Sequence, residues 1–253
     1  MPKLDMPRKA MIMAAGFGTR LRPLTDNMPK PLVKILGKPL IDYTLDFLAE
    51  AGVTEAIVNS HYLAELLEEH VNARTSPPKI IISREDVVLE TGGGIKNALH
   101  LLGNEPFFVI NSDIIYVNGK THALRHLWQY WYDTNMDALL LLHKLGDAIG
   151  YSEKGDFFLE KNGKLRRRIE NETAPFVFTG IQIIHPRLFV NSPNGKFSLN
   201  VLYNKNLNRI GATVGDGNWL HIGSPEELKE AENWFSKETS NYSKEQQKND
   251  SIC

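Results

Sequence analysis

The sequence has few of the features that would assign it to a specialised class of protein. Its single cysteine, Cys253, is the last of 253 residues, which excludes a disulfide framework and a cysteine-based metal site within one chain. Its 29 basic and 30 acidic residues give a net charge of -1, so no excess charge is available to neutralise a nucleic-acid backbone or an anionic membrane. We therefore expect neither nucleic acid nor a membrane among its partners.

Long apolar runs, targeting segments and internal repeats are also absent from the sequence. No run approaches the roughly 20 apolar residues that span a bilayer, and the N-terminus carries prolines but no apolar signal-peptide core. Together with the lack of disulfide-forming cysteines, this predicts a cytoplasmic protein. The oligomeric state is left open between a monomer and a small homo-oligomer.

The first half of the chain alternates regularly between apolar strands and amphipathic helices. The predicted strands cover residues 9–14, 55–59, 79–83 and 107–110, and the predicted helices cover residues 40–51, 63–71 and 93–102. This alternation predicts an α/β fold with a Rossmann-like, mostly parallel sheet and helices on both faces. Ligands are then expected at the carboxyl ends of the strands.

The second half changes to shorter stretches after a helix at residues 123–132 and a strand at 138–143. The short strands are expected at residues 156–160, 164–169 and 176–184, with a hairpin turn at Lys161-Asn162-Gly163-Lys164. These strands predict a small β-rich lid over one side of the cleft.

A single domain is expected over residues 8–235, preceded by an N-terminal extension at residues 1–7. From residue 236 to residue 253 the chain is nearly all polar, so this segment is predicted to be a frayed or disordered tail.

The segment after the first strand has the composition of a phosphate-binding loop. It reads Ala14-Ala15-Gly16-Phe17-Gly18-Thr19-Arg20, and its small residues allow successive backbone amides to approach a polyphosphate closely. Arg20 can contact phosphate oxygens with two parallel hydrogen bonds, and Lys30 adds a point charge between two prolines. The motif is neither the dinucleotide fingerprint, since residue 21 is leucine, nor a P-loop, since no Gly-Lys-Ser/Thr follows.

Residues 14–32 resemble the signature of nucleotidyltransferases that make nucleotide sugars from a nucleoside triphosphate and a sugar 1-phosphate. This resemblance implies an enzyme whose loop residues Ala14, Ala15, Gly16, Gly18 and Thr19 bind the nucleotide. It also implies that Arg20 binds the departing pyrophosphate and that Lys30 lies near the α-phosphate. The likeness extends over about residues 9–235, and no hexapeptide repeat follows it, so the acetyltransferase part of longer relatives is absent.

A triple glycine opens the predicted helix at residue 93, in the stretch Leu89-Glu90-Thr91-Gly92-Gly93-Gly94-Ile95. The amides of Gly92 and Gly93 are expected to read a base edge, with Glu85 as a side-chain partner. The alternative is a glycine-rich helix start without a ligand. This stretch resembles the short uridylyltransferases that act on N-acetylmuramate 1-phosphate in peptidoglycan recycling, which makes UTP the preferred donor.

Asp113 follows the most hydrophobic strand and is expected to be an exposed carboxylate at the edge of the sheet. One carboxylate beside a triphosphate suits Mg²⁺, and Asp113 resembles the family's metal-binding aspartate. The family's second metal aspartate lies in a Trp-x-Asp-x-Gly-Thr-Pro pattern, where this chain has Trp219-Leu220-His221-Ile222-Gly223-Ser224-Pro225. Three alternatives follow: Asp216 replaces the aspartate, His221 binds the metal or the acceptor phosphate, or His221 is structural.

The acceptor sugar is expected beneath the lid. The family's sugar pocket maps to Thr179 and Gly180, with Gly150 as a second contact. A Glu-Lys-Pro of many members has its nearest counterpart at Glu170-Asn171, which retains the acid and lacks the lysine. One of Arg166, Arg167 and Arg168 could supply the missing cation, or the three could form a charged hairpin face.

These residues predict transfer of a nucleotidyl group to a sugar 1-phosphate with release of pyrophosphate. N-acetylmuramate 1-phosphate with UTP is the preferred substrate pair. Guanylyl transfer to mannose 1-phosphate and uridylyl or thymidylyl transfer to glucose 1-phosphate are the alternatives within this chemistry. A catalytically silent protein that binds a nucleotide sugar and regulates a partner is the alternative class, suggested by His221 and the missing lysine.

Overall fold

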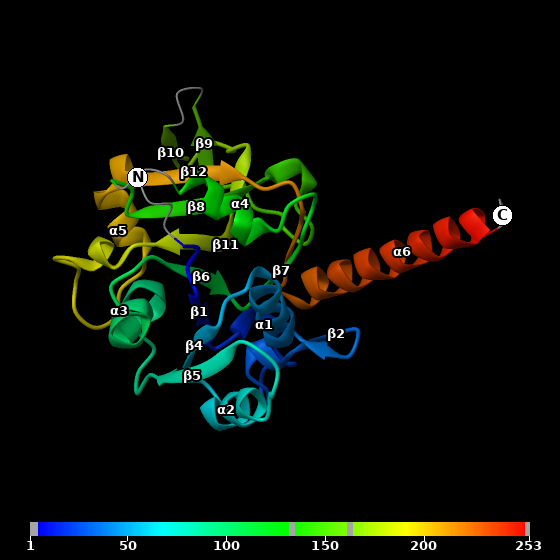
Figure 1. The fold of residues 1–253 in the computed structure, drawn as a ribbon, viewed down its shortest axis with the longest axis horizontal. Helices are drawn as coiled ribbons and strands as arrows, with labels where there is room; N and C mark the ends of the chain where they lie inside the picture. Colours follow the sequence, from blue (N-terminus) through cyan, green and yellow to red (C-terminus); the bar gives the residue numbers. More distant parts are fainter. Residues whose placement is uncertain (1–4, 132–134, 161–163, 251–253) are drawn as a thin grey trace.

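The structure is a computed structural model that describes residues 5–131, 135–160 and 164–250 (Figure 1). Its centre is a nine-stranded sheet whose strands follow the order β10-β9-β11-β6-β1-β4-β5, with β8 and β12 joined through β11. Within the described ranges, no helix combines the length and apolar character of a membrane span.

One half of the sheet is parallel. β1 (Lys9–Met13) lies between β4 (Glu55–Ser60) and β6 (Phe107–Asn111), and β5 (Lys79–Arg84) continues the sheet beyond β4. Parallel strands need crossover connections, and three helices provide them. These helices are α1 (Leu40–Ala51), α2 (Ala64–Asn72) and α3 (Glu90–Leu102).

Successive side chains of β1 enter two different apolar clusters, because a strand alternates its faces. Ala10 and Ile12 pack in one cluster with side chains of α1, α2 and α4 (Ala123–Tyr130), whereas Met11 packs in the other with α3 and α5 (Asn200–Lys205). Helices therefore cover both faces, and the predicted α/β, Rossmann-like fold class is confirmed.

The other half of the sheet is mixed. β11 (Phe176–Ile184) runs antiparallel to both β6 and β8 (Ala138–Lys144), and β12 (Ile210–Val214) runs parallel to β8. β9 (Phe157–Leu159) and β10 (Leu165–Arg167) form an antiparallel pair beside β11. The predicted small β-rich part is therefore continuous with the central sheet at its end. Of the turn predicted at residues 161–164, residues 161–163 lie outside the described residues.

Two short antiparallel pairs complete the fold. β13 (Asn218–His221) pairs with β7 (Ile114–Val117), and β2 (Lys34–Ile35) pairs with β3 (Lys38–Pro39). β7, β12, β13 and α5 were not predicted, whereas the predicted bounds of α1 and β11 agree with the structure. β7 was missed because only two residues separate it from β6. The sequence pattern therefore did not show a second strand directly after the first.

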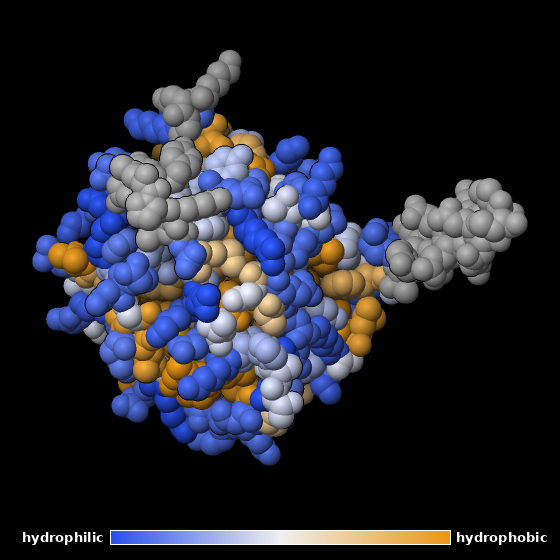
Figure 2. Space-filling view, in the orientation of Figure 1, coloured by the Kyte–Doolittle hydropathy of each residue, from blue (hydrophilic) through white to orange (hydrophobic). Residues whose placement is uncertain are grey.

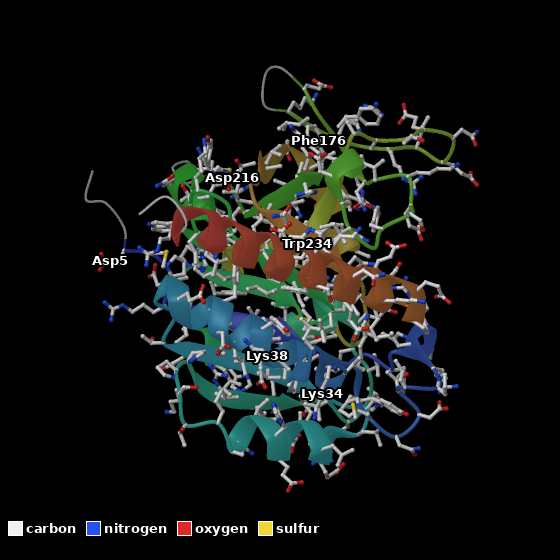
Figure 3. The ribbon with its side chains drawn as sticks, turned by 90° about the vertical axis from the view of Figure 1, so that its right-hand side faces the viewer. Asp5, Lys34, Lys38, Phe176, Asp216 and Trp234 are labelled. Carbon is white, nitrogen blue, oxygen red and sulfur yellow. The ribbon has the colours of Figure 1, made fainter. Side chains whose placement is uncertain are left out.

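The last helix, α6 (Pro225–Asp250), differs from the disordered tail predicted from residue 236. Its first turns are anchored, because Leu228, Trp234 and Phe235 pack against an apolar cluster that includes Leu220. Figure 3 shows the part of α6 at Trp234 lying beside α1. An anchored helix extends easily through Lys-, Glu- and Gln-rich sequence, since these residues are good helix formers. Figure 1 shows its C-terminal part projecting from the domain.

The face shown in Figure 2 is mainly polar, with apolar residues gathered over β5 and α3. β5 is an edge strand of the sheet, and its residues Ile80, Ile81 and Ile82 are half-buried. The carboxyl end of β5 carries Glu85, which is buried. This end of the strand leads directly to the site described below.

Asp156, just before β9, is a half-buried carboxylate that accepts a hydrogen bond from the Phe178 amide at 2.9 Å. Burial raises the pKa of Asp156 above its ordinary value, and the Phe178 amide, Arg167 and Arg168 reverse only part of this effect. A carboxyl whose pKa is higher in the folded state destabilises the fold when it is ionised, at pH values above both pKa values.

We therefore expect Asp156→Asn to raise the melting temperature at pH 7. The gain should shrink as the pH falls through the folded-state pKa toward about 3.9, where the unfolded carboxyl also becomes protonated. Thermal unfolding between pH 3 and pH 8 measures this. Asp5→Asn, at an exposed position, is the control and should show no such change; a lower melting temperature for Asp156→Asn at pH 7 would contradict the assignment.

Candidate functional site

The carboxyl ends of β1, β4, β5 and β6 meet at one edge of the sheet and surround a cleft of about 300 Å³. The cleft brings together most of the residues predicted to bind the nucleotide and its phosphates. These residues are Ala14, Ala15, Gly16, Gly18, Thr19, Arg20, Lys30, Glu85 and Asp113. Segments more than 80 residues apart in the chain therefore share one site, which supports the interpretation of the first motif as a ligand loop.

The glycine loop, residues 14–19, has a conformation that depends on Gly18. Gly18 has a left-handed backbone with φ of 64°, and a Cβ placed there would lie 2.9 Å from the Cβ of Lys30. The Gly18 carbonyl also accepts a hydrogen bond from Thr25 Oγ1 at 2.8 Å. A residue without a side chain at this position therefore lets the loop lie against Lys30.

Lys30 and Asp113 form an ion pair across the floor of the cleft, with Nζ 2.8 Å from Oδ2. The Lys30 side chain is 12% exposed and the Asp113 side chain 26% exposed. Burial alone would raise the pKa of Asp113, but Lys30, His221 and Arg20 outweigh it and hold this pKa below its ordinary value. Asp113 is therefore an ionised carboxylate in a cationic surrounding.

The pairing of β13 with β7 decides which late residue lies beside Asp113. His221 is opposite Ile114, the residue after Asp113, and the Ile222 amide donates to the Asp113 carbonyl at 2.9 Å. Asn218 is opposite Val117, so Asp216 lies beyond the far end of the pair, roughly 13 Å or more from Asp113 at about 3.3 Å per residue.

Asp216 is engaged at that far end, where its Oδ2 accepts a hydrogen bond from the Lys120 amide at 3.1 Å. Figure 3 shows it near α4, well above Trp234 and Lys38. The alternative in which Asp216 completes a metal site with Asp113 is therefore wrong for this structure. Of the described residues, no three His, Cys, Asp or Glu side chains cluster as a ready metal site.

His221 is held next to the first turn of α6. Its side chain is 14% exposed, and Nδ1 lies 3.1 Å from Glu227 Oε2, although the two are not aligned as a hydrogen bond. The same Glu227 oxygen accepts the Gly223 amide at 2.5 Å. Gly150 lies against this segment, since a Cβ there would be 2.5 Å from the His221 carbonyl oxygen. The start of α6 thus places the Glu227 carboxylate beside His221.

The triple glycine of α3 has a different role from the one predicted. The amides of Gly92 and Gly93 both donate to the Phe197 carbonyl, at 2.9 and 3.1 Å. A Cβ at Gly92 would lie 2.3 Å from the Phe197 ring, and one at Gly93 would lie 2.3 Å from the Gly195 carbonyl oxygen. The prediction that these amides read a base edge is therefore wrong: both are already bonded within the protein, and the glycines allow close packing.

Of the predicted acceptor-side residues, Gly180 packs directly against a residue of the cleft. A Cβ at Gly180 would lie 2.9 Å from Nδ2 of Asn111, a residue that lines the cleft. Thr179 is fully buried, and its hydroxyl donates to the Leu141 carbonyl at 2.8 Å. Its side chain therefore stabilises the irregular part of β11 and is not available to a sugar, which corrects the prediction for Thr179.

The three arginines in and after β10 are engaged in contacts with nearby protein groups. Arg166 pairs with Glu172 at 2.7 Å, Arg167 donates to Asn200 and Asn204, and Arg168 donates to the Gly155 carbonyl. Glu170 is exposed in the turn that follows β10 and does not line the cleft. The arginines therefore agree with the alternative in which they form a charged hairpin face. Glu170 lies outside the cleft in this structure.

Several cleft residues were not predicted from the sequence. They include Asn59, Glu90, Thr91, Asn111 and Ser112. Asn59 and Asn111 belong to the carboxyl ends of buried strands, and a polar residue at that position was the signal that could have identified them. Glu90 has φ of 60°, which no pattern in the sequence indicates.

Comparison with known proteins agrees with this geometry. Residues 9–151 match the nucleotidyl transferase family. The N-acetylmuramate alpha-1-phosphate uridylyltransferase of Caulobacter vibrioides is 43% identical over 233 residues, which cover 89% of this chain and 96% of the relative. The enzyme of that name from Neisseria meningitidis is 33% identical and covers 88% and 96% of the two chains. The mannose-1-phosphate guanylyltransferase catalytic subunit beta of Danio rerio is 44% identical over 111 residues, 42% of this chain and 31% of the relative.

Solved structures share the fold at lower identity. HddC from Yersinia pseudotuberculosis, complexed with GMP-PN, superposes with a TM-score of 0.74 at 24% identity, covering 90% of this chain and 99% of that one. A putative glucose-1-phosphate thymidylyltransferase from Bacillus anthracis has the same TM-score of 0.74 at 18% identity, with coverage of 89% and 94%. Given the family match and two relatives that align over nearly their whole length, this chain belongs to the nucleotidyl transferase family and is a nucleotidyltransferase enzyme.

Proposed function

We propose that this enzyme transfers a uridylyl group from UTP to N-acetylmuramate 1-phosphate, forming UDP-N-acetylmuramate and pyrophosphate in cell-wall recycling. The observation that carries this proposal is the 43% identity to a uridylyltransferase of that name over 89% of the chain. Two mannose-1-phosphate guanylyltransferase relatives match 42% and 73% of the chain, and these matches cover only 31% and 50% of the relatives' own length. The acceptor preference therefore rests on the two uridylyltransferases that align over nearly their whole length.

The charges in the cleft suit this reaction. A phosphate oxygen of the acceptor attacks the α-phosphorus of UTP, the bond to the β-phosphate oxygen breaks, and pyrophosphate leaves with the electron pair. The acceptor is already an anion, so the reaction needs no general base and depends on positioning and on charge neutralisation. Lys30, fixed by its 2.8 Å contact with Asp113, and Arg20 are the cations of the cleft that can neutralise the phosphates.

A divalent cation, with Mg²⁺ preferred, is part of the proposal. One carboxylate together with phosphate oxygens is a donor set that Mg²⁺ accepts, and the partly exposed Asp113 carboxylate fits it. Mg²⁺ bound there would neutralise charge on the triphosphate. The position of His221 beside Asp113 supports His221 as the second residue near the ion, and its imidazole is a softer donor that suits Mn²⁺ or Zn²⁺ better.

We expect His221→Asp to lower the Mg²⁺ concentration needed for half-maximal activity by roughly tenfold, because a carboxylate is the harder ligand. Asp216→Asn is the control and should leave the metal dependence unchanged, since Asp216 lies at the other end of the β7–β13 pair. Activity measured against Mg²⁺ and Mn²⁺ concentration checks both variants. If Asp216→Asn changed the metal dependence and His221→Asp did not, Asp216 and not His221 would be the second residue near the ion.

The donor and acceptor are tested by measuring pyrophosphate release. UTP, GTP, dTTP and CTP are each combined with the 1-phosphates of N-acetylmuramate, mannose and glucose. We expect UTP with N-acetylmuramate 1-phosphate to have the highest kcat/KM. A higher value for GTP with mannose 1-phosphate would replace the substrate assignment, and release from no pair would favour the silent regulatory class.

Asp113→Asn should fold normally and lose about a hundredfold in kcat, because one preorganised charge at the reacting phosphate is removed. Circular dichroism and thermal unfolding report on folding, and steady-state rates with saturating Mg²⁺ report on turnover. Full activity of Asp113→Asn would remove this residue from the catalytic role.

A further inference from the structure

A chain of three hydrogen bonds, two of them fully buried, crosses the edge of the sheet at the cleft. The Ala14 amide donates to Asn59 Oδ1 at 2.6 Å, and Asn59 Nδ2 donates to Glu85 Oε1 at 2.7 Å. The Leu89 amide donates to Glu85 Oε2 at 2.9 Å. Asn59 is 2% exposed and Glu85 is 4% exposed. We call these two side chains the Asn59–Glu85 bridge.

The bridge connects two backbone segments that line the cleft. Ala14 begins the glycine loop, and Leu89 immediately precedes Glu90 and Thr91 at the start of α3; Ala14, Glu90 and Thr91 all line the cleft. β4 and β5, which carry Asn59 and Glu85, are neighbours in the sheet. The bridge therefore sets the separation and orientation of the loop relative to the start of α3.

One amide and one ionised carboxylate satisfy this arrangement without taking up a proton. The hydrogen-bond chain ends at a backbone N–H donor on each side, so each side chain must offer an acceptor to its backbone amide and the two must form one donor–acceptor contact between them. Two amides would leave two donors facing each other, and two carboxyl groups would have to bind a proton between them. A buried unmatched contact of this kind is costly, whereas exchange of the amide and the carboxylate keeps all three bonds.

The third glycine of α3 makes room for the bridge. A Cβ at Gly94 would lie 2.7 Å from Glu85 Oε1 and 3.0 Å from Asn59 Nδ2. Gly92 and Gly93 face residues 195–197 instead. The triple glycine thus packs the start of α3 against two different neighbours, and its last member places α3 directly on the bridge.

We propose that Asn59 and Glu85 are positioning residues for the donor nucleotide: by joining the glycine loop to the start of α3, they fix the width and shape of the triphosphate and nucleoside site. This rests on the proposed function, because it assigns the cleft to a nucleoside triphosphate. Glu85 accordingly acts through the protein backbone, which is a different role from the base contact that the sequence predicts.

The test compares Asn59→Asp, Glu85→Gln and the double exchange Asn59→Asp with Glu85→Gln. Glu85→Gln has one unmatched contact, and Asn59→Asp must bind a proton between its two carboxyl groups, so we expect the KM for UTP to rise about tenfold or more in both, with a small change in the KM for the acceptor. The double exchange restores three matched hydrogen bonds and should recover most of the affinity for UTP. Binding of UTP with Mg²⁺ and without acceptor, measured by titration calorimetry, gives the same comparison independently of turnover.

The control exchanges the same residue types on the exposed surface of α2, as Asn72→Asp with Glu69→Gln. It should change neither constant. Thermal unfolding of every variant separates positioning from folding: if the singles lost stability but bound UTP normally in their folded fraction, the bridge would be structural and the proposal wrong. Unchanged UTP binding in both singles, or a double exchange no better than the worse single, would also overturn it.

Failure of the proposed function gives a different result. If wild-type protein binds UTP but does not transfer it to N-acetylmuramate 1-phosphate, the acceptor assignment fails, and the UTP titrations still decide the role of the bridge. If wild-type protein binds a different nucleoside triphosphate, the donor assignment fails and the same titrations are made with that nucleotide. If wild-type protein binds no nucleoside triphosphate, the proposed function and the bridge's role fail together.

Discussion

The parallel pairing of β1 with β4 and β6 is the constraint on which the rest of the site depends. It brings the carboxyl ends of these strands to one edge, with Asn59 beside the end of β1 on one side and Asp113 following β6 on the other. Polar groups at this edge are largely out of water, so each one requires a partner. The Lys30–Asp113 ion pair and the Asn59–Glu85 bridge are two of the ways in which the structure meets this requirement.

The two polar contacts differ in what they affect within the cleft. Lys30 and Asp113 place opposite charges where phosphates and a cation are proposed to bind, and both side chains are partly exposed. Asn59 and Glu85 are almost inaccessible and act on backbone segments. In the proposed reaction, a change in the first pair would alter charge at the reacting groups, whereas a change in the second would alter the shape of the site.

The late part of the chain is coupled to the catalytic edge through β13 and α6. His221 occupies the position where the family pattern has an aspartate, and the start of α6 supplies Glu227 beside it. The apolar anchor of α6, including Trp234 and Phe235, holds this helix start in place. The departure from the family pattern is therefore built into a well-packed region, which is consistent with a functional replacement.

Local patterns were sufficient to predict most of the fold and the first half of the site. Alternating apolar runs predicted the strands and helices of the parallel half, and the segment from Ala14 to Lys30 indicated a phosphate loop, because these features depend on neighbours in the sequence. The choice between His221 and Asp216 depends on the register of β13 against β7, which joins residues about a hundred positions apart. The partners of Gly92, Gly93 and Glu85 were likewise decided by tertiary packing, since a glycine or a carboxylate in the sequence does not reveal which distant group it will contact.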